Sequence, residues 1–371
     1  MLEIDGVCKD WGGGGGEGGF AHGDVSFTVR EGELFVLLGP SGAGKSLLLE
    51  MVAGFDAPDE GTIRIAGVDV TRAPPEARNV GMVYQDLMLF PNMTVAENIA
   101  YGLKARGVSG GEISLRVARF AGMLDIHNLL ERRPMILSSG QKQRVALARA
   151  LAIEPAVLLL DEPFSSVDAP LERILWRELK DLHRETKTTM LLVTHDRAQA
   201  LALGRHIGII RDGRIEQVGA ASDVFERPLT RFVAEFTGAT NILRGSARAG
   251  TMGLSEFSTD ALRLQSTGEA TGRCLGVIRP ENITVSSQAG EANADNVVEG
   301  VVETLTRHGL VFEVTGRFGG VPLTSVVTPQ TLRQLALAPG RRIVFSFEAQ
   351  SVHTLSDDSS PAASDGDVSL G

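Results

Sequence analysis

The 371 residues carry a formal net charge of −10, from 46 acidic and 36 basic side chains. This length predicts two or three domains at roughly 100–200 residues each, and the acidic balance, with 5% aromatic residues, argues against a nucleic-acid partner. The two cysteines, Cys8 and Cys274, form no zinc or disulfide motif. Neither a signal peptide nor an apolar run of about 18 residues is found, so we expect a cytoplasmic location without a membrane span.

Residues 9–20 read KDWGGGGGEGGF, and Gly13, Gly15 and Gly18 match G-x-G-x-x-G, the spacing of a dinucleotide-binding loop. Such a loop follows an apolar strand and opens a helix. Here Phe20 leads into another strand-like run, DVSFTV, so the match lacks the required context. We interpret the glycines as a long connection between the two strands of a hairpin.

Three short apolar runs predict strands that are buried on both faces: ELFVLLG at 33–39, AVLLLDE at 156–162 and TMLLVTH at 189–195. Helix-length segments lie between them. This alternation is typical of an α/β domain with a parallel core sheet, which we expect over residues 1–237. Two further strand-like runs flank Asp212-Gly213, a turn signal that predicts a hairpin.

The segment GPSGAGKS at residues 39–46 fits the phosphate-binding pattern G-x-x-x-x-G-K-[ST], and it follows a strand and opens a helix as that pattern requires. Its backbone N–H groups can surround the phosphates of ATP. Lys45 supplies a positive charge, and the Ser46 hydroxyl can bind Mg²⁺. The other residues expected to contact the nucleotide here are Gly39, Ser41, Gly42, Gly44 and Leu47.

Two acids end the buried run VLLLDEP at residues 157–163. Parallel sheets bind ligands at the carboxyl ends of their strands. Asp161 is therefore predicted to hold Mg²⁺, and Glu162 to polarise the attacking water. The alternative is a strand end with two solvated acids, but the phosphate-binding pattern elsewhere in the chain favours the nucleotide interpretation.

The segment LSSGQKQRVALARAL at residues 137–151, taken with the two preceding motifs, resembles the signature of ABC-transporter ATPases, usually written L-S-G-G-Q. The resemblance implies a parallel core sheet with an antiparallel β subdomain and a helical subdomain. It also implies that Ser138, Gly140 and Gln141 contact the γ-phosphate held by the other subunit, so that ATP is sandwiched in a head-to-tail homodimer. Ser139 departs from the family pattern, since glycine is usual there, and its side chain could crowd the phosphate.

Four further residues match elements of this family, and the resemblance extends from residue 1 to about residue 240. Gln85 in VYQD corresponds to the Q-loop, which touches the Mg²⁺ site and senses the permease. Asp168 in SSVD corresponds to the D-loop at the dimer seam, and His195 in VTHD to the switch histidine at the γ-phosphate. Trp11 in KDWG resembles the A-loop aromatic residue that stacks on adenine. For each residue taken alone, a structural role is the alternative.

The segment QDLMLFPNMTVAENIAYGL at residues 85–103 resembles the region of importer ATPases that forms a groove for a cytoplasmic helix of the membrane subunit. Leu89, Phe90 and Pro91 would line this groove; an ordinary helical-subdomain core is the alternative. The resemblance thus implies two membrane permease subunits as partners, with a substrate-binding protein acting through them. It places the chain on the inner face of the plasma membrane.

The pattern changes after about residue 236 to short strand-like pieces separated by turns, which predict a small all-β barrel over residues 238–355. Within it, VIRPENITVS at residues 277–286 resembles an element of the TOBE/Mop-type barrels of importer ATPases. Residues 356–371 are acidic, small and polar, which predicts a disordered tail.

One predicted helix interrupts the barrel, with Thr328 as its N-cap and Pro329 in its first turn. Its start, near Ser325, Thr328 and Thr331, could hold an oxyanion, and a simple capped helix is the alternative. This part of the chain looks most like family members assigned to molybdate and tungstate uptake.

The resemblance therefore implies the ATPase subunit of an oxyanion importer, with sulfate, iron, polyamine or sugar import as alternatives. A soluble ABC protein acting on nucleic acid or ribosomes is a second class, and the net charge of −10 argues against it. A stand-alone P-loop kinase or GTPase is a third class, in which the LSSGQ helix and His195 would have no role.

Overall fold

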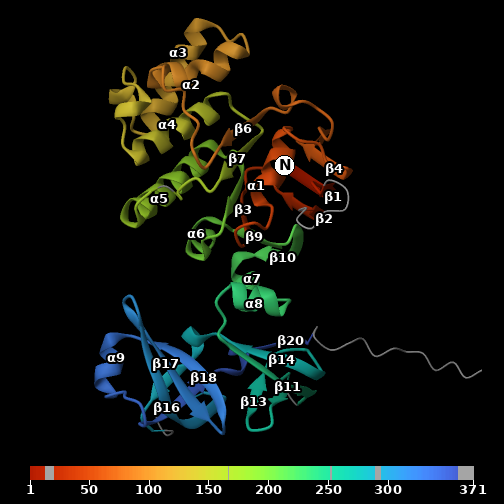
Figure 1. Ribbon diagram of the computed structural model, residues 1–371, viewed down its shortest axis with the longest axis vertical. Helices are drawn as coiled ribbons and strands as arrows, with labels where there is room; N and C mark the ends of the chain where they lie inside the picture. Colours follow the sequence, from red (N-terminus) through yellow and green to blue (C-terminus); the bar gives the residue numbers. More distant parts are fainter. Residues whose placement is uncertain (13–20, 166, 251–252, 289–293, 358–371) are drawn as a thin grey trace, which may run out of the picture. The chain divides into compact units, whose positions relative to one another are not determined.

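The computed structural model describes residues 1–12, 21–165, 167–250, 253–288 and 294–357. The chain divides into two compact units, Met1–Ala221 and Ser222–Gly371 (Figure 1). This division precedes the boundary predicted after residue 237. The reason is that α7 (Ala221–Glu226) and α8 (Arg231–Phe236) belong with the second unit, where Arg279 donates hydrogen bonds to the carbonyls of Phe225 and Thr237.

A six-stranded sheet in the order β10-β9-β3-β8-β7-β6 forms the centre of the first unit. The strands are β3 (Leu34–Leu38), β6 (Val80–Val83), β7 (Val157–Asp161), β8 (Thr189–Thr194), β9 (His206–Arg211) and β10 (Arg214–Ala220). All pairs are parallel except β9 with β10, which form the predicted hairpin. Every residue of β3, β7 and β8 is buried, which confirms the three strands predicted from the apolar runs.

Three helices accompany this sheet: α1 (Lys45–Ala53), α5 (Ala169–Thr186) and α6 (Arg197–Leu203). Three others gather at one end of the unit in Figure 1, namely α2 (Val95–Ala105), α3 (Gly110–Met123) and α4 (Ser139–Ala152). They contact one another and form the helical subdomain that the resemblance implied. Among the helices of the described ranges, none has the length and apolar character needed to cross a membrane.

A four-stranded antiparallel sheet completes the first unit, in the order β2-β1-β4-β5. Its strands are β1 (Leu2–Asp10), β2 (Ala21–Val29), β4 (Glu60–Ile65) and β5 (Val68–Asp69). Asp10 lies opposite Ala21 in the β1–β2 pair, so the glycine-rich segment joins two hairpin strands, as predicted. The glycines of the G-x-G-x-x-G match themselves lie outside the described residues.

The second unit is built from two five-stranded antiparallel sheets, in the orders β13-β12-β11-β14-β20 and β15-β19-β16-β17-β18. They share one apolar core, to which Phe257, Phe318 and Phe345 contribute, and this confirms the predicted all-β domain. The predicted tail begins inside a strand, because β20 ends at Ser356; residues from 358 lie outside those described. The strands are β11 (Asn241–Ala249), β12 (Ser255–Ser258), β13 (Arg263–Ser266), β14 (Gly272–Ile278), β15 (Thr284–Ser286), β16 (Asn296–His308), β17 (Val311–Phe318), β18 (Val321–Val327), β19 (Arg342–Phe347) and β20 (Val352–Ser356).

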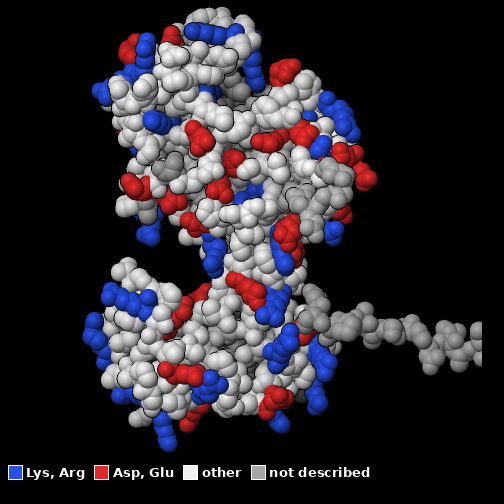
Figure 2. Space-filling model, viewed as in Figure 1, with Lys and Arg blue, Asp and Glu red and all other residues white. Residues whose placement is uncertain are grey.

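The remaining elements are short. The predicted helix of the second unit is α9 (Pro329–Gln334). Single turns of 3₁₀ helix lie at Pro75–Ala77, His127–Leu129, Pro134–Ile136, Pro280–Asn282 and Ala349–Ser351. On the face shown in Figure 2, acidic and basic side chains are interspersed over both units, so the net negative charge is not concentrated in one visible patch.

Candidate functional site

The carboxyl ends of β3, β7 and β8 meet at one edge of the core sheet, because these strands are parallel neighbours. The phosphate-binding segment follows β3, Asp161 and Glu162 lie at the end of β7, and His195 follows β8. This edge is where parallel α/β sheets bind ligands. The fold therefore brings together three segments that are distant in the sequence.

The phosphate-binding segment has a backbone that requires glycine at three positions. At Gly39, an added Cβ would collide with the carbonyl oxygen of Ile210 in β9. Gly42 and Gly44 have φ angles of 81° and 90°, in the left-handed region that other residues rarely adopt. Gly44 is the N-cap of α1, so the first N–H groups of that helix, which have no partner within a helix, begin at Lys45. An anion placed there would meet these donors and the positive end of the helix dipole.

Lys45 is only 5% exposed and points into the same loop. Its Nζ donates to the carbonyls of Gly39 (3.0 Å) and Pro40 (2.9 Å), and lies 3.7 Å from Oε1 of Glu162. Burial lowers the pKa of Lys45, and the charges of Glu162 and Asp161 act in the opposite direction. Phosphate oxygens would be stronger acceptors for this ammonium group than the two carbonyls.

Ser46 and Asp161 are in direct contact, since the Ser46 hydroxyl donates to Oδ1 of Asp161 at 2.9 Å. Burial raises the pKa of Asp161, which is 7% exposed; the nearby Glu162 adds to this effect, while Ser46 and Lys45 oppose it. Gln85 is exposed just after β6, the neighbour of β7, and so lies at the same edge of the sheet. This set of oxygen atoms fits Mg²⁺, which commonly binds one or two carboxylates together with substrate phosphates.

Glu162 and His195 are in direct contact, with Oε2 of Glu162 3.0 Å from Nδ1 of His195. Glu162 has a φ of 39°, and its N–H donates to the carbonyl of Val193 in β8. A non-glycine residue in the left-handed region is often held there at a functional site. One carboxylate thus lies between Lys45 and His195.

The signature residues lie at the start of α4, where their hydrogen bonds stay local. The Ser138 hydroxyl accepts from the N–H of Gln141 (3.3 Å), and the Gln141 side chain accepts from the N–H of Ser138 (3.1 Å), which is a capping box. Gly140 is buried, with space for an added Cβ limited by Leu171, while Ser139 is exposed. Asp168 is the exposed N-cap of α5. Within the described residues of one chain, no hydrogen bond or ion pair joins the side chains of Ser138, Gln141 or Asp168 to the phosphate loop.

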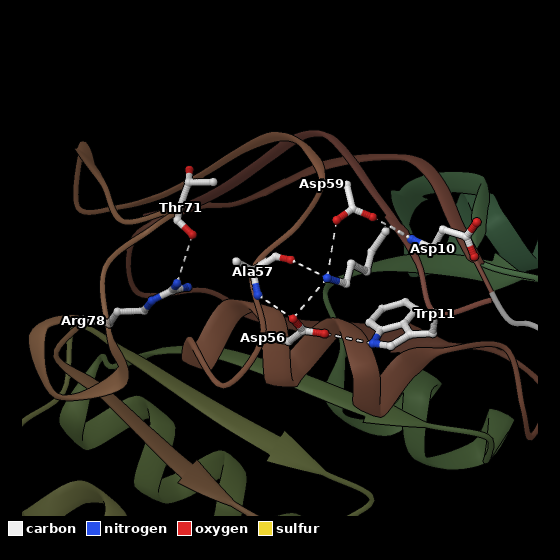
Figure 3. Close-up of polar contacts among 8 residues, drawn as sticks. Asp10, Trp11, Asp56, Ala57, Asp59, Thr71 and Arg78 are labelled. Atoms are coloured by element: carbon white, nitrogen blue, oxygen red, sulfur yellow. Dashed lines mark hydrogen bonds and ion pairs between the residues drawn. The ribbon is translucent and has the colours of Figure 1, made fainter. Parts of the chain in front are cut away.

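Trp11 directly follows β1 and is half-buried against the core that includes α1. Its indole Nε1 donates to Oδ2 of Asp56 at 2.9 Å (Figure 3). The ring also lies edge-on to His22, with 5.2 Å between the ring centroids. Sequence reasoning missed both neighbours, because neither Asp56 nor His22 belongs to a recognisable motif.

His22 is 2% exposed and connects this tryptophan to the phosphate loop. Burial lowers its pKa to about 4, while a hydrogen bond with the backbone of Gly44 acts in the opposite direction. The turn of the β9–β10 hairpin lies beside it: the N–H of Gly213 donates to the carbonyl of Ala43, and its carbonyl accepts from the N–H of Gly23. Trp11 and the phosphate loop are therefore both next to β2, which carries His22.

We expect His22 to make stability depend on pH. The unfolded chain binds a proton as the pH falls from 6.5 towards about 4, while the folded chain keeps His22 neutral. The contribution of His22 to the free energy of unfolding is thus fully present above pH 6.5 and is lost as the pH falls to about 4. The loss is about 3 kcal/mol, because each pKa unit corresponds to about 1.4 kcal/mol. Urea unfolding of His22→Leu should show a flatter dependence over the same range. His127→Leu, at a 70% exposed side chain, is the control; an unchanged slope in His22→Leu would contradict this assignment.

The predicted permease groove lies between β6 and α2. Phe90 packs 4.4 Å from the ring of Tyr101, and its N–H donates to Oδ1 of Asn98 at 2.8 Å. Leu89 is half-buried and Pro91 is exposed. Two large apolar side chains near them, Met88 and Tyr101, are also exposed. The structure thus presents an apolar surface at the predicted position, with Phe90 serving also as a packing residue.

The predicted oxyanion site in the second unit is not assembled. Thr328 does cap α9, where its hydroxyl accepts from the N–H of Thr331. However, Ser325 is buried and donates to the carbonyl of Ile283 at 2.6 Å, and the hydroxyls of Thr328 and Thr331 bond to each other at 3.0 Å. The three hydroxyls are engaged by the protein, so the geometry favours the alternative of a simple capped helix.

Comparison with known proteins agrees with this geometry. The ABC transporter family model matches residues 22–165, and the TOBE domain model matches residues 292–354. The molybdate/tungstate import ATP-binding protein WtpC of Pyrococcus horikoshii is 39% identical over 353 residues, which cover 95% of this chain and 99% of the relative. The spermidine/putrescine import ATP-binding protein PotA of Thermobifida fusca is 41% identical over 298 residues, covering 79% and 77%. The sulfate/thiosulfate import ATP-binding protein CysA of Mesostigma viride is 40% identical over 278 residues, covering 75% and 78%.

A similar protein of known structure was solved with a bound nucleotide. The ATP-binding cassette MJ0796, a dimer in a post-hydrolysis state bound to ADP and phosphate, is 31% identical with a TM-score of 0.53. The match covers 60% of this chain and 99% of the cassette. The chain therefore belongs to the ABC transporter family, as an ATPase that couples ATP hydrolysis to transport.

Proposed function

We propose that the chain is the ATP-hydrolysing subunit of an importer of molybdate or tungstate. The observation that carries this proposal is the match with WtpC over 95% of the chain and 99% of the relative, because it includes the second unit as well as the ATPase unit. The relatives named for polyamine and sulfate import have similar identities over smaller shares of the chain. Import of one of these substrates is therefore the second candidate.

In the proposed site, ATP lies along the carboxyl edge of the core sheet. Its phosphates accept hydrogen bonds from the N–H groups of the phosphate loop and from Lys45, while Trp11 stacks on adenine. Mg²⁺, held by Ser46, Asp161 and Gln85, would neutralise part of the phosphate charge. The 2.9 Å contact between Ser46 and Asp161 supports this, because it brings two oxygen ligands to the loop.

Glu162 is the proposed general base. Its carboxylate takes a proton from water as the water oxygen bonds to the γ-phosphorus and the bond to the β–γ bridging oxygen breaks. His195, 3.0 Å from Glu162, orients that carboxylate and donates to the γ-phosphate. Lys45 stabilises the charge that develops on the phosphate oxygens.

The signature residues complete the site from a second copy of the chain. Ser138, Gly140 and Gln141 of that copy would offer the N-terminus of α4 to the γ-phosphate, with Asp168 at the seam. The exposure of Ser138, and its position as the N-cap of α4, support this arrangement. The apolar surface around Phe90 would bind the permease, and the chain would lie on the cytoplasmic face of the membrane.

Uptake in the host organism tests the substrate. In a strain whose only copy carries Glu162→Gln, accumulation of molybdate and tungstate, measured by elemental mass spectrometry, should fall to the level of a deletion strain. Uptake of sulfate and spermidine should stay at the parent level. Normal molybdate and tungstate uptake with a loss of sulfate or spermidine uptake would replace the proposal with the second candidate.

A further inference from the structure

The indole of Trp11 is held in place by an acid that no nucleotide motif contains. Oδ2 of Asp56 accepts from the indole Nε1 at 2.9 Å, while Oδ1 accepts from the N–H of Ala57 at 2.8 Å and lies 3.2 Å from Nζ of Lys9. Figure 3 shows the contacts of this carboxylate with the indole of Trp11 and the N–H of Ala57. Both oxygen atoms are thus engaged, so the carboxylate has a fixed orientation towards the indole.

The lysine that holds Asp56 is itself anchored. Nζ of Lys9 donates to the carbonyl of Ala57 (3.0 Å) and to Oδ1 of Asp59 (3.4 Å). The other oxygen of Asp59 accepts from the N–H of Asp10 at 3.0 Å. These contacts tie the end of β1, which carries Trp11, to the turn after α1. The orientation of the indole is therefore held by a network of connected hydrogen bonds and not by a single one.

Helix α1 connects this arrangement to the phosphate loop, because it starts at Lys45 and ends at Ala53, just before Asp56. Arg78 fixes the end of the helix, with Nη1 donating to the carbonyls of Met51 (2.7 Å) and Val52 (3.0 Å). These contacts fix the end of the helix that leads into the turn with Asp56. The acid thus sets the position of the indole relative to the phosphate loop.

The charge of Asp56 fixes the direction of its hydrogen bond with the Trp11 indole. Burial raises the pKa of Asp56, but hydrogen bonds from Lys9, Ala57 and Trp11 outweigh it and lower the pKa overall. Asp56 is therefore ionised near neutral pH and can only accept hydrogen bonds. The indole N–H, which can only donate, is its matching partner.

We propose that Asp56 is a positioning residue that presets the orientation of the Trp11 indole for stacking on the adenine base. The inference rests on the proposed role of Trp11 in binding adenine. A ring that is already oriented loses less conformational freedom when the base binds, so preorganisation strengthens binding of ATP without a contact between Asp56 and the nucleotide. Loss of Asp56 should therefore weaken the binding of ligands that contain the adenine base and leave the binding of phosphates alone unchanged.

The test compares ATP with inorganic tripolyphosphate, which lacks the base, as ligands of the full chain in calorimetry. Asp56→Ala should raise the Kd for ATP about three- to tenfold, the range expected for one lost hydrogen bond, and leave the Kd for tripolyphosphate unchanged. Asp56→Asn, which keeps an acceptor oxygen, should stay closer to the parent. Asp181→Ala, at an exposed acid on α5, is the control and should leave both Kd values unchanged. An equal loss for both ligands would overturn the proposal.

A double-mutant cycle separates this inference from the role of Trp11. Trp11→Phe keeps an aromatic ring without the N–H, so Asp56→Ala should cause no further loss of ATP affinity in that background. A further loss would overturn the inference. If Trp11→Ala leaves the Kd for ATP unchanged, the proposed role of Trp11 fails as well. If Trp11→Ala weakens ATP binding but Asp56→Ala does not, only the inference fails.

Discussion

Glu162→Gln is expected to bind ATP with parent affinity and to hydrolyse it roughly 10²–10⁴-fold more slowly, the contribution of a positioned general base. Glutamine keeps the size of the side chain and an acceptor oxygen, but it cannot take a proton from water near neutral pH. The carboxylate lies 3.0 Å from His195 and 3.7 Å from Lys45, where it can meet a water beside the terminal phosphate.

Phosphate release and ATP binding should be measured on the same preparation of this variant. Glu185→Gln, at an exposed acid on α5, is the control and should hydrolyse ATP at the parent rate. If Glu162→Gln keeps the parent rate, the base is another group. If it loses ATP affinity in parallel with the rate, Glu162 contributes to binding and not selectively to hydrolysis.

Lys45→Ala is expected to raise the Kd for ATP by roughly one to two orders of magnitude, because charge-assisted hydrogen bonds contribute about 1.5–3 kcal/mol each. The ammonium group is buried at the centre of the phosphate loop, between two backbone carbonyls and Glu162. Removing it also leaves the buried Asp161 and the half-buried Glu162 with less compensating charge, so the site repels phosphate more strongly.

Calorimetric titration with ATP measures this effect, and circular dichroism on the same variant shows whether the fold persists. Lys180→Ala, at an exposed lysine on α5, should bind ATP normally. A folded Lys45→Ala chain with parent affinity would show that the phosphates bind elsewhere.

Local sequence patterns were sufficient for much of this site. The buried strands could be predicted because β3, β7 and β8 are continuous apolar runs, and the phosphate loop because its glycines and lysine are adjacent in the chain. The convergence of Lys45, Glu162 and His195 then follows from the parallel order of the strands. Their roles in hydrolysis remain proposals that the variants above test.

What the sequence did not reveal depends on contacts between distant segments. Asp56 meets Trp11 across 45 positions, in a turn with no motif. The hydroxyl of Ser325 donates to the carbonyl of Ile283, 42 positions away. This contact is not visible in the sequence around the predicted helix, so the sequence could not show that the hydroxyl is engaged. The division of the chain at Ala221 depends on such contacts as well, because Arg279 binds the carbonyls of Phe225 and Thr237.

The central claim is that ATP is held between the phosphate loop of one chain and the signature helix of another. Crosslinking tests it most directly, with Ser41→Cys in one chain and Ser138→Cys in the other, both on a Cys8→Ser, Cys274→Ala background with Glu162→Gln. Both serines are exposed. A short thiol-specific crosslinker should give a dimer-sized product when the two chains are mixed with ATP, and little with either chain alone. The absence of that product at saturating ATP would contradict the account.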